Sequence, residues 1–205
     1  MGECRWCYQV MEDWDRDFPP MTALRPAIFL DRDGTLNKAI VREGKPYPPS
    51  TPEEFVLLPG VLEGCARLKQ AGFLLVVATN QPDVGRGTQK QEIVEAIHAR
   101  MLKQLSIDRI EVCYHAGRGE PCDCRKPAPG MLMRAAEALA INLSKSWMIG
   151  DRWRDIDCGQ AAGCRTIFID QGYDEKLRAI PDFTACDFLQ ATAIVLNNSP
   201  RSHPP

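Results

Sequence analysis

Residues 26–35 read PAIFLDRDGT, an apolar run that stops at Asp31 and gives way to an acidic segment. An apolar run without alternation is typical of a strand that is buried on both faces, as in a parallel sheet covered by helices. The sequence therefore predicts a buried strand at 26–30 that delivers two carboxylates, those of Asp31 and Asp33, directly beyond its last residue.

Similar apolar runs recur along the chain, and the segments between them carry apolar residues at helical spacing. We expect strands at 73–78, 110–114, 147–149 and 166–169, and helices at 61–70, 88–105, 130–139 and 155–162. This alternation predicts an α/β fold with a doubly wound, Rossmann-like parallel sheet. The length of 205 residues suits a single domain. We place it at 23–197, with an N-terminal extension at 1–22 and a disordered tail at 198–205.

Composition narrows the classes of function. The net charge is -2, with both signs interspersed, so nothing favours a nucleic-acid partner or a membrane surface. The chain has no apolar run near the ~20 residues of a membrane span, and its beginning lacks the basic and apolar regions of a secretory signal. We therefore expect a cytoplasmic protein. Nine cysteines, an odd number, argue against a disulfide framework there.

Polar residues gather where the expected strands end, which is where open α/β sheets bind ligands. Each of these segments alone is an ordinary turn or a solvated first turn of a helix. Their order, each at a strand end or helix start, indicates a site instead. The segments are Asp31-Arg32-Asp33-Gly34-Thr35, Thr79-Asn80-Gln81, Lys126-Pro127 and Gly150-Asp151.

The residue types suit phosphoryl transfer. Asp31 can attack phosphorus, and Asp33 can protonate the leaving oxygen and then deprotonate water. Like unit charges ~4 Å apart repel by ~4 kcal/mol at an effective dielectric of ~20, so a phosphate beside these carboxylates needs a cation. Asp31 and Asp151 offer oxygen ligands suited to Mg²⁺. Thr79 and Lys126 can hold the phosphoryl oxygens.

Four segments resemble the ordered motifs of the haloacid dehalogenase superfamily of phosphatases: FLDRDGTLN, VVATNQPDVGRG, CDCRKPAPGM and MIGDRWRDIDCGQAAG. The resemblance implies that Asp31 is the nucleophile and Asp33 the general acid/base. It also implies Mg²⁺ bound by the Asp31 side chain, the Asp33 backbone carbonyl and Asp151, and phosphate bound by Thr79 and Lys126. Members often carry a cap domain, but 38–58 and 82–87 are too short for one, so we expect a capless form.

Three cysteines and a histidine lie close together beyond the expected strand at 110–114. Cys113 and His115 form one pair, Cys122 and Cys124 the other, and six residues, AGRGEP, separate the pairs. A Cys₃His set suits a closed, tetrahedral structural Zn²⁺, and a polar, Gly-rich loop needs such a staple. The alternative is a coincidence of thiols in a cysteine-rich chain. The arrangement resembles the zinc loop of bacterial heptose bisphosphate phosphatases and related histidinol-phosphate phosphatases.

The expected substrate is a small phosphorylated sugar or related metabolite, bound by a monomer under three loops: 38–52, 82–87 and the zinc loop. We expect substrate contacts from Asn80, Gln81 and Arg125. Arg125, tethered between the zinc loop and Lys126, is placed to bind a second phosphate. By resemblance, the reaction is removal of the 7-phosphate from D-glycero-D-manno-heptose 1,7-bisphosphate. The alternatives are a histidinol-phosphate phosphatase and a phosphate-binding scaffold without turnover.

Overall fold

The structure is a computed structural model that describes residues 24–42, 45–117 and 122–199. The expected N-terminal extension at 1–22 lies outside the described residues, as does most of the expected tail at 198–205. Within the described part, no helix is long and apolar enough to cross a membrane.

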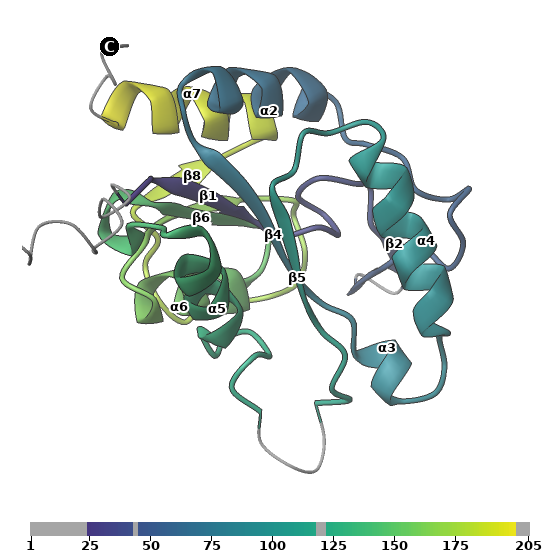
Figure 1. Cartoon of the computed structure of the whole chain (residues 1–205). Helices are drawn as coiled ribbons and strands as arrows, with labels where there is room; N and C mark the ends of the chain where they lie inside the picture. Colours follow the sequence, from purple (N-terminus) through teal and green to yellow (C-terminus); the bar gives the residue numbers. More distant parts are fainter. Residues whose placement is uncertain (1–23, 43–44, 118–121, 200–205) are drawn as a thin grey trace, which may run out of the picture.

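Six parallel strands form one sheet, in the order β5-β4-β1-β6-β7-β8 (Figure 1). The strands are β1 (Ala27–Leu30), β4 (Leu74–Asn80), β5 (Arg109–Cys113), β6 (Trp147–Gly150), β7 (Arg165–Ile169) and β8 (Phe183–Ala185). The chain moves outward from β1 through β4 to β5 and then returns to the other side of β1 at β6. This reversal creates a switch point beside β1, where sheets of this type bind their ligands.

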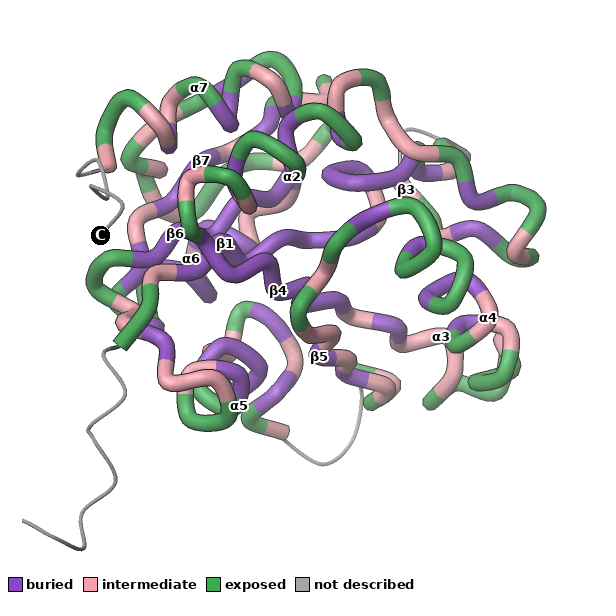
Figure 2. The backbone as a smooth tube through the Cα atoms, turned by 45° about the horizontal axis from the view of Figure 1, so that its top comes forward, coloured by how far each residue is buried: buried purple, intermediate pink, exposed green. Residues whose placement is uncertain are grey.

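Helices cover both faces of the sheet, so the central strands β1, β4 and β6 are largely apolar. On β1, Ile28 and Leu30 belong to one core with residues of α2, α4 and α7, whereas Ala27 and Phe29 belong to a second core with α5 and α6. The strands accordingly lie buried at the centre of the molecule (Figure 2). The helices are α2 (Val61–Gln70), α4 (Gln91–Leu102), α5 (Gly130–Leu139), α6 (Trp153–Ala161) and α7 (Phe188–Asn198).

The α/β prediction is confirmed, and the bounds expected for α2 and α5 match. The helix expected at 88–105 is too long at both ends, since α4 already stops at Leu102. The backbone N–H groups of Thr88 and Gln89 donate to the Asp83 carbonyl at 2.9 and 3.0 Å, so they close the turn after the short helix α3 (Pro82–Gly85). Helix α4 begins only at Gln91.

Several elements were not expected from the sequence: the antiparallel hairpin of β2 (Ile40–Arg42) and β3 (Lys45–Tyr47), the 3₁₀ helix η1 (Leu143–Lys145), strand β8 and helix α7. A signal for α7 was present. Asp187 caps it by accepting from the Gln190 N–H at 2.7 Å, and its buried residues recur at helical spacing.

Candidate active site

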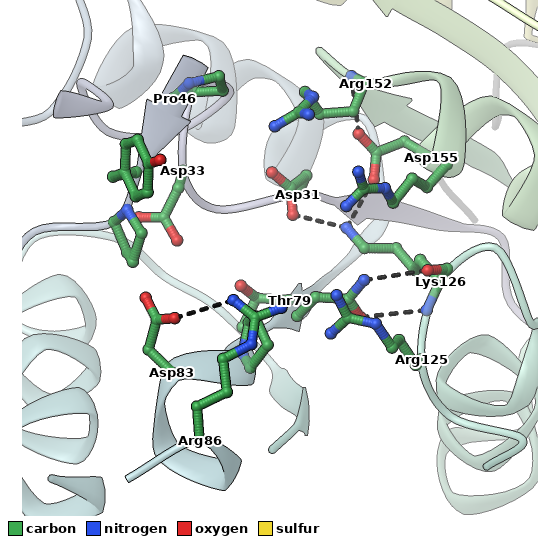
Figure 3. Close-up of a pocket in the computed structure, with 15 residues that line it drawn as sticks. Asp31, Asp33, Pro46, Thr79, Asp83, Arg86, Arg125, Lys126, Arg152 and Asp155 are labelled. Carbon is green, nitrogen blue, oxygen red and sulfur yellow. Dashed lines mark hydrogen bonds and ion pairs between the residues drawn. The ribbon is translucent and has the colours of Figure 1, made fainter. Parts of the chain in front are cut away.

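The predicted catalytic residues meet at the carboxyl ends of β1, β4 and β6. Asp31 follows β1, and its N–H donates to the Ile149 carbonyl at 3.0 Å. Thr79 lies near the end of β4, and Asp151 directly follows β6. A cavity of about 300 Å³ opens here (Figure 3). Two of the three expected roofing segments contribute to its lining, through Pro46, Tyr47, Pro48, Pro82, Asp83 and Arg86. No described residue of the zinc loop itself lines the cavity, although Arg125, which follows its last cysteine, does.

Three buried carboxylates and one lysine form the bottom of this site, which we call the carboxylate floor: Asp31, Asp151, Asp155 and Lys126. One oxygen from each carboxylate lies within 4.8 Å of the others. Lys126 Nζ lies 2.5 Å from Asp31 Oδ1 and 2.6 Å from Asp155 Oδ1 (Figure 3). A single ammonium cannot neutralise three ionised carboxylates, so the floor carries excess negative charge.

Burial, together with this crowding, shifts the pKa values of the floor residues. Burial raises the pKa of Asp31 to about 6, against the opposing effect of Lys126. Burial, with Asp31 and Asp155 nearby, raises the pKa of Asp151 well above its ordinary value. Burial opposes the charge of Lys126, but Asp155 and Asp31 outweigh it and raise the pKa of that ammonium.

The floor fits a divalent cation. Asp151 Oδ1 accepts from the Thr35 hydroxyl at 3.3 Å, whereas its buried Oδ2 has no hydrogen-bond partner among the described residues. A buried carboxylate oxygen without a partner is costly unless an ion satisfies it. Gly34 keeps this space open: its φ is +98°, and an added Cβ would lie 1.9 Å from Asp151 Oδ2. Hard oxygen donors gathered beside Asp31 are the ligands that Mg²⁺ prefers.

Asp33 lies beside the floor, at the edge of the cavity, and several donors fix its carboxylate. Arg32 donates from Nε to Oδ1 at 3.1 Å and from Nη2 to Oδ2 at 2.9 Å. Asn37 donates to Oδ1 at 3.1 Å, and Gln81 donates to Oδ2 at 2.8 Å. The expected acid/base is therefore oriented by its neighbours on the first loop and by the residue that follows β4.

The residues at the end of β4 are used in several ways. Thr79 lines the cavity, and its Oγ1 accepts from Gln81 at 2.8 Å. Asn80 also lines the cavity, but its side-chain amide pairs with both backbone groups of Lys126, at 3.1 Å each. Gln81 is buried behind Thr79 and Asp33. In the structure, Asn80 and Gln81 thus position catalytic residues, and their expected contact with substrate stays a prediction.

The four residues expected to bind zinc converge beyond β5. Cys113 Sγ and Cys124 Sγ lie 3.5 and 3.2 Å from His115 Nδ1, and Cys113 Sγ lies 3.9 Å from Cys122 Sγ. Tetrahedral ligands at Zn–S ≈ 2.3 Å are separated by about 3.8 Å, so the spacing fits the metal. Residues 118–121 of the loop lie outside the described residues.

Four arginines surround the mouth of the cavity, and we call them the guanidinium rim: Arg86, Arg125, Arg152 and Arg154. Arg125 packs against the zinc loop: its Nη1 donates to the His115 carbonyl at 3.4 Å, and a Cβ at Gly117 would lie 2.7 Å from its Nε. Arg86 pairs with Asp83 at 3.2 Å (Figure 3).

The other two rim arginines share one acidic partner. Arg152 pairs with Glu175, and Arg154 Nη2 lies 3.6 Å from the same carboxylate. Burial, followed by the nearby charge of Arg152, lowers the pKa of Arg154. Glu175 is thus a shared counter-charge for the two guanidiniums.

The sequence reasoning assigned no role to Asp155, Arg152, Arg154 or Glu175. A signal for Asp155 existed, since it follows Asp151 by one helical turn. Its side chain accepts from the Arg152 N–H at 3.0 Å and so caps α6. Glu175 lies in the loop after β7 and carries no such signal.

Comparisons with known proteins agree with this geometry. Residues 123–191 match the family model described as HAD-hydrolase-like. Over 153 residues, the chain is 35% identical to D-glycero-beta-D-manno-heptose-1,7-bisphosphate 7-phosphatase of Pseudomonas aeruginosa, covering 72% of this chain and 83% of that protein. It is 38% identical over 157 residues to the Yersinia pestis protein of that name, covering 71% and 80%.

Among solved structures, the chain resembles D,D-heptose 1,7-bisphosphate phosphatase from B. bronchiseptica, crystallised with magnesium and phosphate. The TM-score is 0.69 at 31% identity, with 85% of this chain and 99% of that chain covered. The chain belongs to the haloacid dehalogenase-like phosphatases, hydrolases that act on phosphomonoesters. Within that class, the two relatives above and this solved structure are all heptose bisphosphate phosphatases.

Proposed function

We propose that this protein removes the 7-phosphate from D-glycero-D-manno-heptose 1,7-bisphosphate through an aspartyl-phosphate formed on Asp31. The observation that carries the proposal is that Asp31, Lys126 and Asp155 of the carboxylate floor line the same cavity as the four arginines of the guanidinium rim. The floor supports the chemistry at one phosphate, and the rim supports binding of another. The heptose relatives supply the sugar.

Residues in the floor and beside it have distinct tasks in the proposed reaction. Asp31 Oδ attacks phosphorus, and the P–O bond to the sugar breaks as Asp33 gives its proton to the departing oxygen. Asp33 then takes a proton from water, which attacks phosphorus and returns Asp31 as a free carboxylate. Lys126 and Thr79 hold the phosphoryl oxygens as negative charge develops.

Mg²⁺, bound by Asp31, Asp151 and the Asp33 backbone carbonyl, would supply the positive charge that lets a phosphate dianion approach a carboxylate. Asp155 is an additional ligand candidate because its carboxylate joins the same cluster. It already pairs with Lys126 at 2.6 Å, so we assign it to holding that ammonium in place.

The guanidinium rim is proposed to bind the phosphate that is not cleaved. Arginine suits this task because its planar fork can donate two parallel hydrogen bonds to a phosphate. Arg125 contacts the zinc loop and Arg154 contacts Glu175. The two approach the cavity from separate segments, one before α5 and the other in the first turn of α6. Zinc at the Cys₃His cluster would act structurally, because four protein ligands leave no position for substrate.

The rim also separates the alternatives. Histidinol phosphate carries an ammonium group, which three arginines (Arg125, Arg152 and Arg154) would repel. A scaffold without turnover would not need an intact floor, yet its residues are buried and paired as catalysis requires.

The test is hydrolysis of heptose 1,7-bisphosphate, heptose 7-phosphate, histidinol phosphate and p-nitrophenyl phosphate, each with Mg²⁺. We expect the bisphosphate to give the highest kcat/KM, with heptose 1-phosphate as product. A higher value for histidinol phosphate would refute the sugar assignment, and no hydrolysis of any phosphate would refute the enzymatic one.

A further inference from the structure

His98 lies on the buried face of α4, where an apolar side chain is expected. The buried residues of α4 are Val94, Ile97, His98 and Met101, which together form the stripe that faces the core. A polar group at such a position is destabilising unless a hydrogen bond satisfies it. The remaining members of the stripe are apolar, so the imidazole calls for its own explanation.

The partner of His98 is Arg32, a guanidinium with no exposed surface. Arg32 Nη1 lies 2.9 Å from His98 Nε2. Since a guanidinium only donates, Nε2 must accept, and the ring must be neutral. Burial and the charge of Arg32 lower the pKa of His98 to about 4, which keeps it neutral at physiological pH.

The other side of the same guanidinium faces the expected acid/base. Arg32 Nε and Nη2 both donate to Asp33, at 3.1 and 2.9 Å. The three residues thus form a chain, His98 to Arg32 to Asp33, in which one rigid fork joins α4 to the catalytic loop. Each N–H direction of a guanidinium is fixed by the others, so fixing Nη1 fixes the fork.

We propose that His98 is a positioning residue for Asp33: by accepting from Arg32, it holds the guanidinium where it aligns the Asp33 carboxylate with the leaving oxygen. This rests on the proposed role of Asp33 as general acid. Arg32 also stabilises the carboxylate that remains once Asp33 has given up its proton. The effect of His98 must therefore grow with the need of the leaving group for that proton.

Two aryl phosphates measure this need without any assumption about the sugar. Phenyl phosphate releases an oxygen that requires a proton more strongly than the oxygen of p-nitrophenyl phosphate does. For His98→Leu we expect kcat/KM to fall about 10- to 100-fold with phenyl phosphate and much less with p-nitrophenyl phosphate. The ratio between the substrates does not depend on how much of the variant is folded. In His98→Gln the amide oxygen can accept from Arg32, so this variant should keep most of the kcat/KM for phenyl phosphate that His98→Leu loses.

Asp33→Asn serves as the reference. If it loses phenyl phosphate hydrolysis selectively and His98→Leu shows the same selectivity, the inference is supported. If Asp33→Asn is selective but His98→Leu lowers kcat/KM equally for both substrates, or for neither, His98 has only a packing role and the inference is wrong. If Asp33→Asn itself shows no selectivity, the acid assignment fails, and the role of His98 fails with it.

Discussion

The carboxylate floor and the guanidinium rim face the same cavity but are built in different ways. Floor residues are between 1% and 8% exposed. The three carboxylates stand at strand ends or in the first turn of α6, whereas Lys126 lies in the segment that precedes α5. Rim arginines are partly or largely exposed and come from three separate segments: the end of α3, the segment that precedes α5 and the start of α6. The residues proposed to carry the reaction are therefore held by burial, whereas those proposed to select the substrate lie on more exposed segments.

The largest effect on catalysis is expected from a change in the floor, at the proposed nucleophile Asp31. Asp31→Asn keeps the shape of the side chain but removes the attacking charge, so we expect kcat to fall roughly 10⁴-fold or more. Rapid quench of the unchanged protein should trap phosphate on Asp31. Circular dichroism and thermal melting serve as the control for folding. Substantial turnover by the variant, with deamidation excluded, would contradict the mechanism.

Magnesium should act on the floor alone, and its effect should depend on pH. In the metal-free protein the pKa of Asp31 is raised from 3.8 to about 6. A raised pKa in the folded state stabilises the protein below about pH 4, and this stabilisation is lost as pH rises through about 6. Above about pH 6 Asp31 is ionised, and a bound Mg²⁺ would offset its negative charge. Mg²⁺ should therefore raise the thermal midpoint more near pH 7.5 than near pH 5.

Activity provides the second half of this prediction. Chelation should abolish hydrolysis, and added Mg²⁺ should restore it. Asp151→Asn removes one proposed ligand charge, so it should raise the Mg²⁺ concentration needed for half-maximal activity by about tenfold or more. A variant with the original Mg²⁺ dependence, or a Mg²⁺ effect on melting that does not change with pH, would count against the ligand assignment.

A residue of the site could be predicted where a local sequence pattern places it, and could not be predicted where only the fold or the path of a loop does. Asp31 and Asp151 directly follow apolar strands, so a pattern in the sequence is enough to place them. Asp155 lies one helical turn later, and only the fold brings it back to Lys126. Glu175 lies in a loop after β7, and its contact with Arg154 depends on the path of that loop. The strand order could not be predicted because an apolar run does not indicate which other strands pair with it.

The zinc loop connects the two regions, so disrupting it should affect both to a moderate degree. We expect about one Zn per chain, ligated by the Cys₃His cluster. Cys122→Ser should lower the thermal midpoint by roughly 5–10 °C. It should also raise KM and lower kcat, because Arg125 and Lys126 directly follow Cys124. Cys186→Ser, which changes an exposed thiol outside the cluster, is the matched control. A fully active protein purified without zinc would make the cluster incidental.

The smallest effect is expected at Arg154, and it should be confined to the rim. Its hydrogen bonds to a distal phosphate would be charge-assisted but partly screened by water, so Arg154→Ala should raise KM for heptose 1,7-bisphosphate about tenfold. The chemistry on the floor is untouched, so kcat should change little, and KM for p-nitrophenyl phosphate, which has no second phosphate, should stay nearly constant. Arg67→Ala removes the same charge from an exposed helix pair with Glu63 and controls for net charge.

Arg125→Ala should give the same selective rise in KM, since both arginines are proposed to bind one phosphate from separate segments of the chain. Two groups that share a ligand are coupled, so the double variant should lose less than the product of the single losses. If instead the losses multiply, the two guanidiniums bind independent groups. An unchanged KM for the bisphosphate in both single variants would remove the reason for assigning a second phosphate to this cavity, while leaving the Asp31 chemistry intact.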